Sequence, residues 1–221
     1  VWLTSLYLLK EDLGKAKNSP KFSQMFSKST EINILSAARL FLFGARDVWF
    51  VIAVPVYLSS QFNWDHWRVG SFLALWVIGY GIVQSLAPHI TGKKKQQIPS
   101  GQQAKFWAML LSMIPAAIAI GIHSFDQSLW ILLAGLIVFG VVFAINSSLH
   151  SYLIVHYASE DGVSLDVGFY YMANAMGRLI GTILSGWIYQ DFGLIACLWV
   201  SCGFLVLTSA ISFWLPKKAT S

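Results

Sequence analysis

The feature that most constrains this chain is a series of apolar runs, each about as long as a lipid bilayer is thick. A membrane-spanning helix needs about 20 predominantly apolar residues, and several of the runs reach that length. Charged residues make up only 11% of the 221 residues, whereas soluble domains carry about 25%. We therefore expect an all-α integral membrane protein.

Short polar linkers divide the apolar sequence into six expected spans. Their ranges are about 32–58, 69–90, 105–122, 128–156, 164–189 and 193–215, which together form a six-transmembrane-helix bundle over 32–215. Residues 1–9 are apolar but too few to span, and they lack the basic region and cleavage site of a signal peptide. We interpret them as the end of a truncated transmembrane helix, in a chain that is a fragment or one piece of a split protein. Residues 10–31 form a charged connector, and residues 216–221 form a short tail.

Basic residues set the expected orientation, because lysine and arginine concentrate in cytoplasmic loops. Alternate linkers on one side hold eleven lysines, whereas the other side holds only Arg68. The lysines are Lys10, Lys15, Lys17, Lys21, Lys28, Lys93, Lys94, Lys95, Lys105, Lys217 and Lys218. The split places the connector and the C-terminus in the cytoplasm of a multi-pass protein in the cell's inner (plasma) membrane. It also accounts for the net charge of +5 without a nucleic-acid partner.

Three arginines remain inside the spans: Arg39, Arg46 and Arg178. A charge at the bilayer centre costs on the order of 3 kcal/mol, so each should face a partner or a water-filled cavity. Arg39 and Arg46 are two helical turns apart and share a face, and Arg46 and Arg178 both fall near mid-span. Because arginine grips carboxylate, phosphate or arsenate oxygens with two donors, we expect an anion-binding site. The alternative is that these arginines only hold helices together.

Two acidic residues bear on this site. Asp47 follows Arg46 directly, and adjacent residues point about 100° apart on a helix, so we expect this pair to be poorly aligned. Asp47 is a candidate for proton coupling or charge balance, and a purely structural role stays open. Asp166 lies near the cytoplasmic end of its span, where we expect it to be solvated or paired with the lysines at 93–95.

Further polar residues at helical spacing extend the candidate substrate site. They are the line Tyr170, Asn174 and Arg178, the pair Asn146 and His150, and the pair Tyr80 and Gln84. Asn146 and His150 suit interhelical hydrogen bonds as well as they suit a transport pathway. By contrast, the stripe Gly177, Gly181 and Ser185 indicates close helix packing rather than a site.

Chemistry of the enzymatic kind is not expected. Neither His150 nor His156 has a metal-ligand spacing with other donors, and the sequence holds no phosphate-binding glycine loop or nucleophile–base set. We predict no metal, no cofactor and no enzymatic activity.

Six spans after a long cytoplasmic connector resemble the C-terminal half of a major facilitator superfamily transporter. The stretches SAARLFLFGARDVWFV, GSFLALWVIGYGIVQSLAP, NSSLHSYLIV and DGVSLDVGFYYMANAMGRLIGTILSGW look like the ArsJ family of organoarsenical efflux permeases. This resemblance covers nearly the whole chain. It implies one half of a 12-helix fold, with a missing N-terminal six-helix half that supplies the rest of the site.

The resemblance also implies a substrate. Members of the ArsJ family export 1-arseno-3-phosphoglycerate, which a partner glyceraldehyde-3-phosphate dehydrogenase makes from arsenate, and the pair confers arsenate resistance. We therefore expect secondary active efflux of a small organic polyanion across the lipid bilayer, driven by an ion or proton gradient. Two alternatives stay open: a transporter of another organic anion such as a sugar phosphate, and a non-transporting membrane scaffold.

Overall fold

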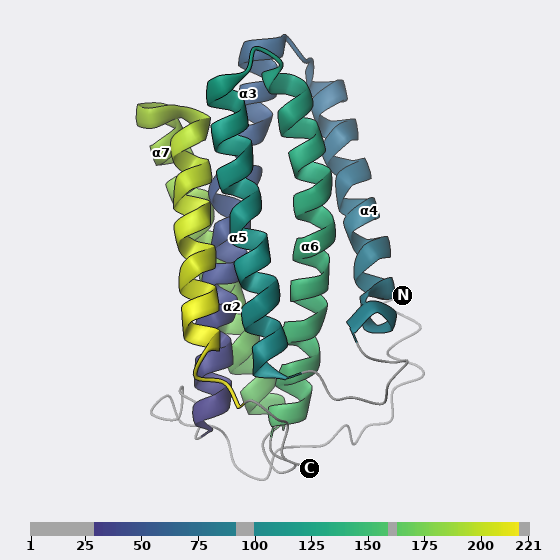
Figure 1. Cartoon of the computed structure of the whole chain (residues 1–221), viewed down its shortest axis with the longest axis vertical. Coiled ribbons are helices and arrows are strands. Elements are labelled where there is room, and N and C mark those ends of the chain that lie inside the picture. The colour runs from purple at the N-terminus through teal and green to yellow at the C-terminus, as the bar shows by residue number, and fades with distance from the viewer. Residues whose placement is uncertain (1–28, 92–99, 159–162, 217–221) are drawn as a thin grey trace, which may run out of the picture.

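The computed structural model describes residues 29–91, 100–158 and 163–216, and all the regular structure in these ranges is helical. The helices run side by side along the long axis of the molecule (Figure 1). The prediction of an all-α membrane bundle is therefore confirmed. The expectations for residues 1–28, for the lysines at 93–95 and for residues 217–221 concern parts of the chain outside the described residues.

The helices are α2 (Thr30–Phe50), α3 (Ala53–Phe62), α4 (His66–Thr91), α5 (Gly101–Ser124), α6 (Ser128–Tyr157) and α7 (Val163–Ser212). Within the described ranges, five helical segments are long and apolar enough to cross a membrane: Thr30–Phe62, His66–Pro88, Gly101–Ser124, Ser128–Tyr157 and Leu165–Ser212. The first segment combines α2 and α3.

The last helix, α7, folds back on itself at Gly193. This residue has φ 77° and ψ −176°, a backbone conformation that favours glycine, and the helix reverses there at the upper end of Figure 1. As a result, the Cys197 sulfur lies 3.9 Å from the Ser185 carbonyl oxygen, although the two residues are twelve positions apart. The two arms, 163–192 and 194–212, are antiparallel, and the fifth segment is long enough to cross a membrane twice.

The first span is interrupted where α2 gives way to α3, just before Pro55. Proline has no N–H to offer the carbonyl four residues earlier, so regular helix geometry is lost at Val51 and Ile52. The first N–H of α3, on Ala53, donates instead to the Ser185 hydroxyl at 3.2 Å. A neighbouring helix thus satisfies a backbone group that the break releases.

Close glycine packing holds α2 against the first arm of α7. A side-chain carbon added at Gly177 would collide with the Leu40 carbonyl, and one at Gly181 would lie 2.6 Å from the Gly44 carbonyl oxygen. The interpretation of the glycine stripe as a packing surface is therefore confirmed. On its other side α2 meets the second arm, where the Ser201 hydroxyl donates to the Ala45 carbonyl at 2.7 Å. Both arms of α7 thus fix the position of α2.

One tryptophan of helix α4 contacts both α2 and α6. The Trp76 indole N–H donates to the Leu136 carbonyl of α6 at 2.8 Å, and its ring fits over Gly140, where a side-chain carbon would lie 3.0 Å away. Trp76 also packs against Phe50 of α2, with ring centroids 4.3 Å apart. These contacts place the inner face of α4 beside α2 and α6.

Candidate intramembrane anion site

Asp47 of α2 lies at the centre of a charged cluster in the middle of the bundle. Its side chain is only 1% exposed, and its two carboxylate oxygens have different partners. Arg46 Nε donates to Oδ1 at 2.6 Å, and Arg178 Nε, from the first arm of α7, donates to Oδ2 at 3.1 Å. Asp47 therefore bridges two arginines from different helices.

The expectation that Arg46 and Asp47 would be poorly aligned is wrong. Helical periodicity fixes the direction of the Cα–Cβ bond, but the arginine side chain has enough rotatable bonds to turn its guanidinium back toward the next residue. Burial favours this arrangement, because an unpaired carboxylate in such a place would be costly. The nearly equal depth predicted for Arg46 and Arg178 agrees with their shared partner.

Arg39, one of the predicted site residues, is buried with only 4% of its surface exposed. Its Nε donates to the Asn174 side-chain oxygen at 3.2 Å, and its Nη1 donates to the Ser147 backbone carbonyl at 3.1 Å. The guanidinium carbon also lies 5.1 Å from the centre of the Tyr170 ring. All of these contacts are with neutral groups. Within the described ranges, no carboxylate forms an ion pair with Arg39.

One aromatic ring joins the two parts of the cluster. The guanidinium carbon of Arg39 lies 4.0 Å from the centre of the Phe43 ring, and that of Arg46 lies 5.0 Å from the same point. The two guanidinium carbons are therefore no more than about 9 Å apart. Such contacts stabilise each cation by about 1 kcal/mol or more where water is excluded. They do not neutralise its charge.

Two buried residues of α6, near the Ser147 carbonyl that Arg39 contacts, have polar atoms without a hydrogen-bond partner in the described part of the chain. Asn146 and His150 are fully buried; the Asn146 amide nitrogen donates to the Val142 carbonyl, while its oxygen accepts no hydrogen bond from any described residue. Both ring nitrogens of His150 also lack a hydrogen-bond partner within the described ranges, and the charge of Arg39 acts on this ring. Buried polar atoms are normally hydrogen-bonded, so orphaned ones next to a buried cation are consistent with a binding site.

The remaining predicted residues lie around this cluster. Gln84 of α4 contacts α6, with its amide nitrogen 3.5 Å from the Ser147 hydroxyl. Tyr80 stacks on Trp76 with ring centroids 5.8 Å apart and meets Phe143 at the same distance. The predicted line Tyr170, Asn174 and Arg178 does face α2, since its members contact Arg39 or Asp47.

Asp166 does not lie where a solvated residue would. It is only 6% exposed at the start of α7, so it is not solvated; the other expectation, a pair with the lysines at 93–95, concerns residues outside the described ranges.

Two contributors were missed at the sequence level, Phe43 and Ser147. Phe43 lies four residues after Arg39 and three before Arg46, so its place on their shared face could have been predicted from the helical period. Ser147 acts mainly through its backbone carbonyl. No side-chain pattern reveals which helical carbonyl will accept an additional hydrogen bond.

The charge of the cluster does not balance. Within the described ranges the cluster has three arginines and one carboxylate, and the exposed fraction of the arginine side chains decreases from Arg178 (56%) to Arg46 (13%), while Arg39 is almost fully buried. Asp47 is shared by Arg46 and Arg178, and Arg39 has no carboxylate partner, so the cluster has an excess of two positive charges that is suited to an anion. No group of three or more potential metal ligands occurs among the residues described.

The fold and this cluster together define a membrane-spanning helical bundle with a cationic centre. The sequence profile of the Major Facilitator Superfamily matches residues 35–221, so the chain belongs to that family of membrane transporters. No curated protein matches the chain significantly.

Proposed function

We propose that the chain is part of a secondary active exporter of a small organic polyanion, with 1-arseno-3-phosphoglycerate as its substrate and arsenate resistance as the outcome. Membership in the Major Facilitator Superfamily supports transport, and the likeness of four long stretches to the ArsJ permeases supports the substrate. The single structural observation on which the proposal rests is Arg39: a buried guanidinium within the membrane with only neutral partners among the described residues.

The cost of burying Arg39 is the first step of the argument. A lone charge at the bilayer centre costs about 3 kcal/mol or more. Contacts with amide oxygens and aromatic rings offset much of this kind of cost for Arg39, but they bring no negative charge to it. An anionic ligand at this position would supply the missing charge. Arg39 also keeps Nη2 free of any protein hydrogen bond in the described ranges, so one donor of its fork is available to a ligand.

The spacing of the cations supports a ligand with two anionic ends. The guanidinium carbons of Arg39 and Arg46 are within about 9 Å of each other, and both contact the Phe43 ring. An organoarsenical phosphoglycerate has an arsenate at one end of a three-carbon chain and a phosphate at the other. Each group presents several oxygens to which an arginine fork can bind.

In this proposal Asp47 supplies the negative charge for the arginines before the substrate binds. It neutralises one charge and holds Arg46 and Arg178 in position by hydrogen bonds to both of its oxygens. When the substrate arrives, Arg178 can turn toward it, because its side chain is more than half exposed. Coupling to a proton or ion gradient would then act through Asp47, the one acidic residue of the described ranges that contacts both Arg46 and Arg178.

The test is arsenate tolerance of arsenate-sensitive bacteria that express the intact protein together with a glyceraldehyde-3-phosphate dehydrogenase. We expect tolerance only when both proteins are present, and we expect the Arg39→Gln variant to lose it while membrane abundance is unchanged. Arg68→Gln is the matched control, because Arg68 is an exposed arginine at the start of α4, away from the cluster.

Each alternative has its own result in this test. Unchanged arsenate tolerance, combined with uptake of a sugar phosphate by membrane vesicles, would identify a transporter of another organic anion. A non-transporting scaffold would show no flux of either anion, and Arg39→Gln would then act only by reducing the amount of folded protein.

A further inference from the structure

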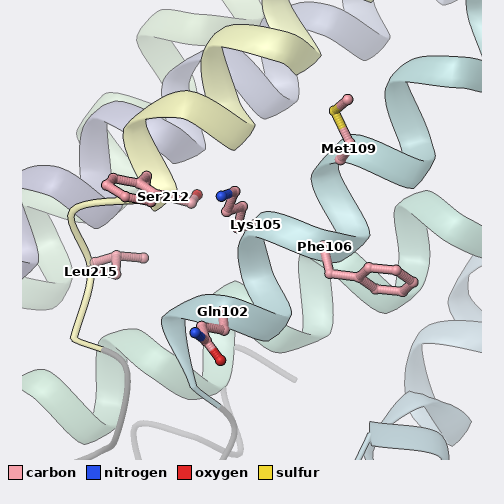
Figure 2. A pocket seen from close by; sticks show the side chains of 7 residues that line it. Gln102, Lys105, Phe106, Met109, Ser212 and Leu215 are labelled. Atoms are coloured by element: carbon pink, nitrogen blue, oxygen red, sulfur yellow. The ribbon is translucent and has the colours of Figure 1, made fainter.

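A hollow of about 310 Å³ lies at the end of the bundle where α5 begins and α7 ends, separate from the arginine cluster. It is lined by Gln102, Lys105, Phe106, Met109, Ser212, Phe213 and Leu215. Figure 2 shows the side chains of Lys105 and Ser212 pointing toward one another across it. Most of its walls are apolar, and one cation reaches into it.

The cation, Lys105, is available to a ligand. Its ammonium lies 4.5 Å from the centre of the Phe213 ring, a favourable contact that leaves the charge in place. In the described part of the chain, no carboxylate forms an ion pair with Lys105, and none of the seven lining residues is acidic. The hollow therefore has a net positive charge.

The walls beyond Lys105 are exposed and apolar. Phe106 is 62% exposed, Met109 54% and Phe213 60%. Met109 follows Lys105 by one helical turn on α5, toward the middle of the membrane-crossing segment Gly101–Ser124. A cation at the end of a spanning helix, followed inward by an apolar surface, matches the order of headgroup and acyl chain in a lipid leaflet.

We infer that this hollow is a binding site for an anionic phospholipid of the cytoplasmic leaflet. The headgroup phosphate lies at Lys105, with the Gln102 amide beside it, and an acyl chain follows Phe106 and Met109. The leaflet is assigned from the sequence, because Lys93, Lys94 and Lys95 precede α5 and Lys217 and Lys218 follow α7. This inference does not depend on which anion the protein transports.

Native mass spectrometry of the intact purified protein tests the site with two lipids that share acyl chains: phosphatidylglycerol and phosphatidylcholine. We expect phosphatidylglycerol to bind more tightly, and we expect Lys105→Gln to weaken that binding by about fivefold, the effect of one basic residue near an anionic lipid. Phosphatidylcholine binding should not change. The control Arg68→Gln removes an exposed cation from a different helix and should leave both affinities unaltered.

Two further measurements keep the test decisive. Phe213→Leu retains an apolar wall but removes the aromatic contact with Lys105, and it should weaken phosphatidylglycerol binding less than Lys105→Gln does. Glycerol 3-phosphate, which lacks acyl chains, should fail to displace the lipid. Displacement by glycerol 3-phosphate would overturn the assignment to a lipid, and equal losses in Lys105→Gln and Arg68→Gln would overturn the site.

Discussion

Arg178 and Asp47 are 131 positions apart in the chain, yet Arg178 Nε donates to Asp47 Oδ2 at 3.1 Å. The contact joins the first arm of α7 to α2 at the level where the glycine packing brings the two helices closest. Because Asp47 is buried and also binds Arg46, it is both a packing element and the only acid in contact with the arginines within the described ranges. Substitutions can separate these two properties.

Replacing Asp47 with asparagine should reduce both stability and transport. The amide keeps the size of the side chain but leaves Arg46 and Arg178 without a counter-charge. Loss of one partner of a fully buried pair costs about 3–5 kcal/mol. Because Arg178 is half exposed, we expect a smaller loss of stability, about 2 kcal/mol. The apparent melting temperature of the purified protein should fall by several degrees. Asp47→Glu retains the charge, so it should recover part of the loss; an Asp47→Asn protein as stable as wild type would show that the bridge contributes nothing.

Close approach of α2 and α7 should depend on Gly177. A methyl group there collides with the Leu40 carbonyl, so Gly177→Ala must push the helices apart, and overpacking of this kind costs about 1–3 kcal/mol. The shift would also draw Arg178 away from Asp47. Thermal unfolding of the purified protein measures the effect.

The matched control for this substitution is Gly203→Ala on the second arm of α7. A methyl group at Gly203 meets no atom within 4 Å, and alanine favours the helix more than glycine does. Its stability should therefore equal or slightly exceed that of wild type. Equal destabilisation by both alanines would contradict the packing role assigned to Gly177.

The attachment of α4 should depend on Trp76 far more than on Trp67. Trp76→Phe removes the indole N–H and with it the hydrogen bond to the Leu136 carbonyl, whereas Trp67 is 86% exposed. We expect Trp76→Phe to cost about 1–2 kcal/mol and Trp67→Phe to have little effect. Limited proteolysis after the linker at 63–65 offers a second measurement, since loosening of α4 should speed cleavage only in the Trp76 variant.

Much of the fold could be predicted from the sequence, because bilayer thickness fixes the length of an apolar helix and leaves few alternatives. The linker QDFG, for example, marks the reversal that the structure places at Gly193. Helical spacing also placed Tyr170, Asn174 and Arg178 on one face, and that face does lie against α2. The helical period predicts this shared face because it fixes the direction in which each side chain leaves the backbone.

The hydrogen-bonded pairs within the site could not be predicted in the same way, since they depend on the positions of the charged groups at the ends of long, flexible side chains. The Arg46 guanidinium turns back to Asp47, and Arg39 reaches the backbone carbonyl of Ser147 on another helix. Both arrangements follow from the three-dimensional packing of α2, α6 and α7. The sequence could indicate an excess of cations but not which of them Asp47 would neutralise.

The central claim is that the Arg39 cluster binds a phosphorylated organic anion, and a direct binding measurement tests it most sharply. The ligand is 3-phosphoglycerate, a stable molecule with the same three-carbon chain and phosphate as the proposed substrate, titrated into the intact purified protein by calorimetry. We expect binding to wild type and to Arg68→Gln with equal affinity, and binding at least about tenfold weaker to Arg39→Gln, because a charge-assisted hydrogen bond contributes about 1.5–3 kcal/mol. A folded Arg39→Gln protein that binds 3-phosphoglycerate as tightly as wild type would contradict the account.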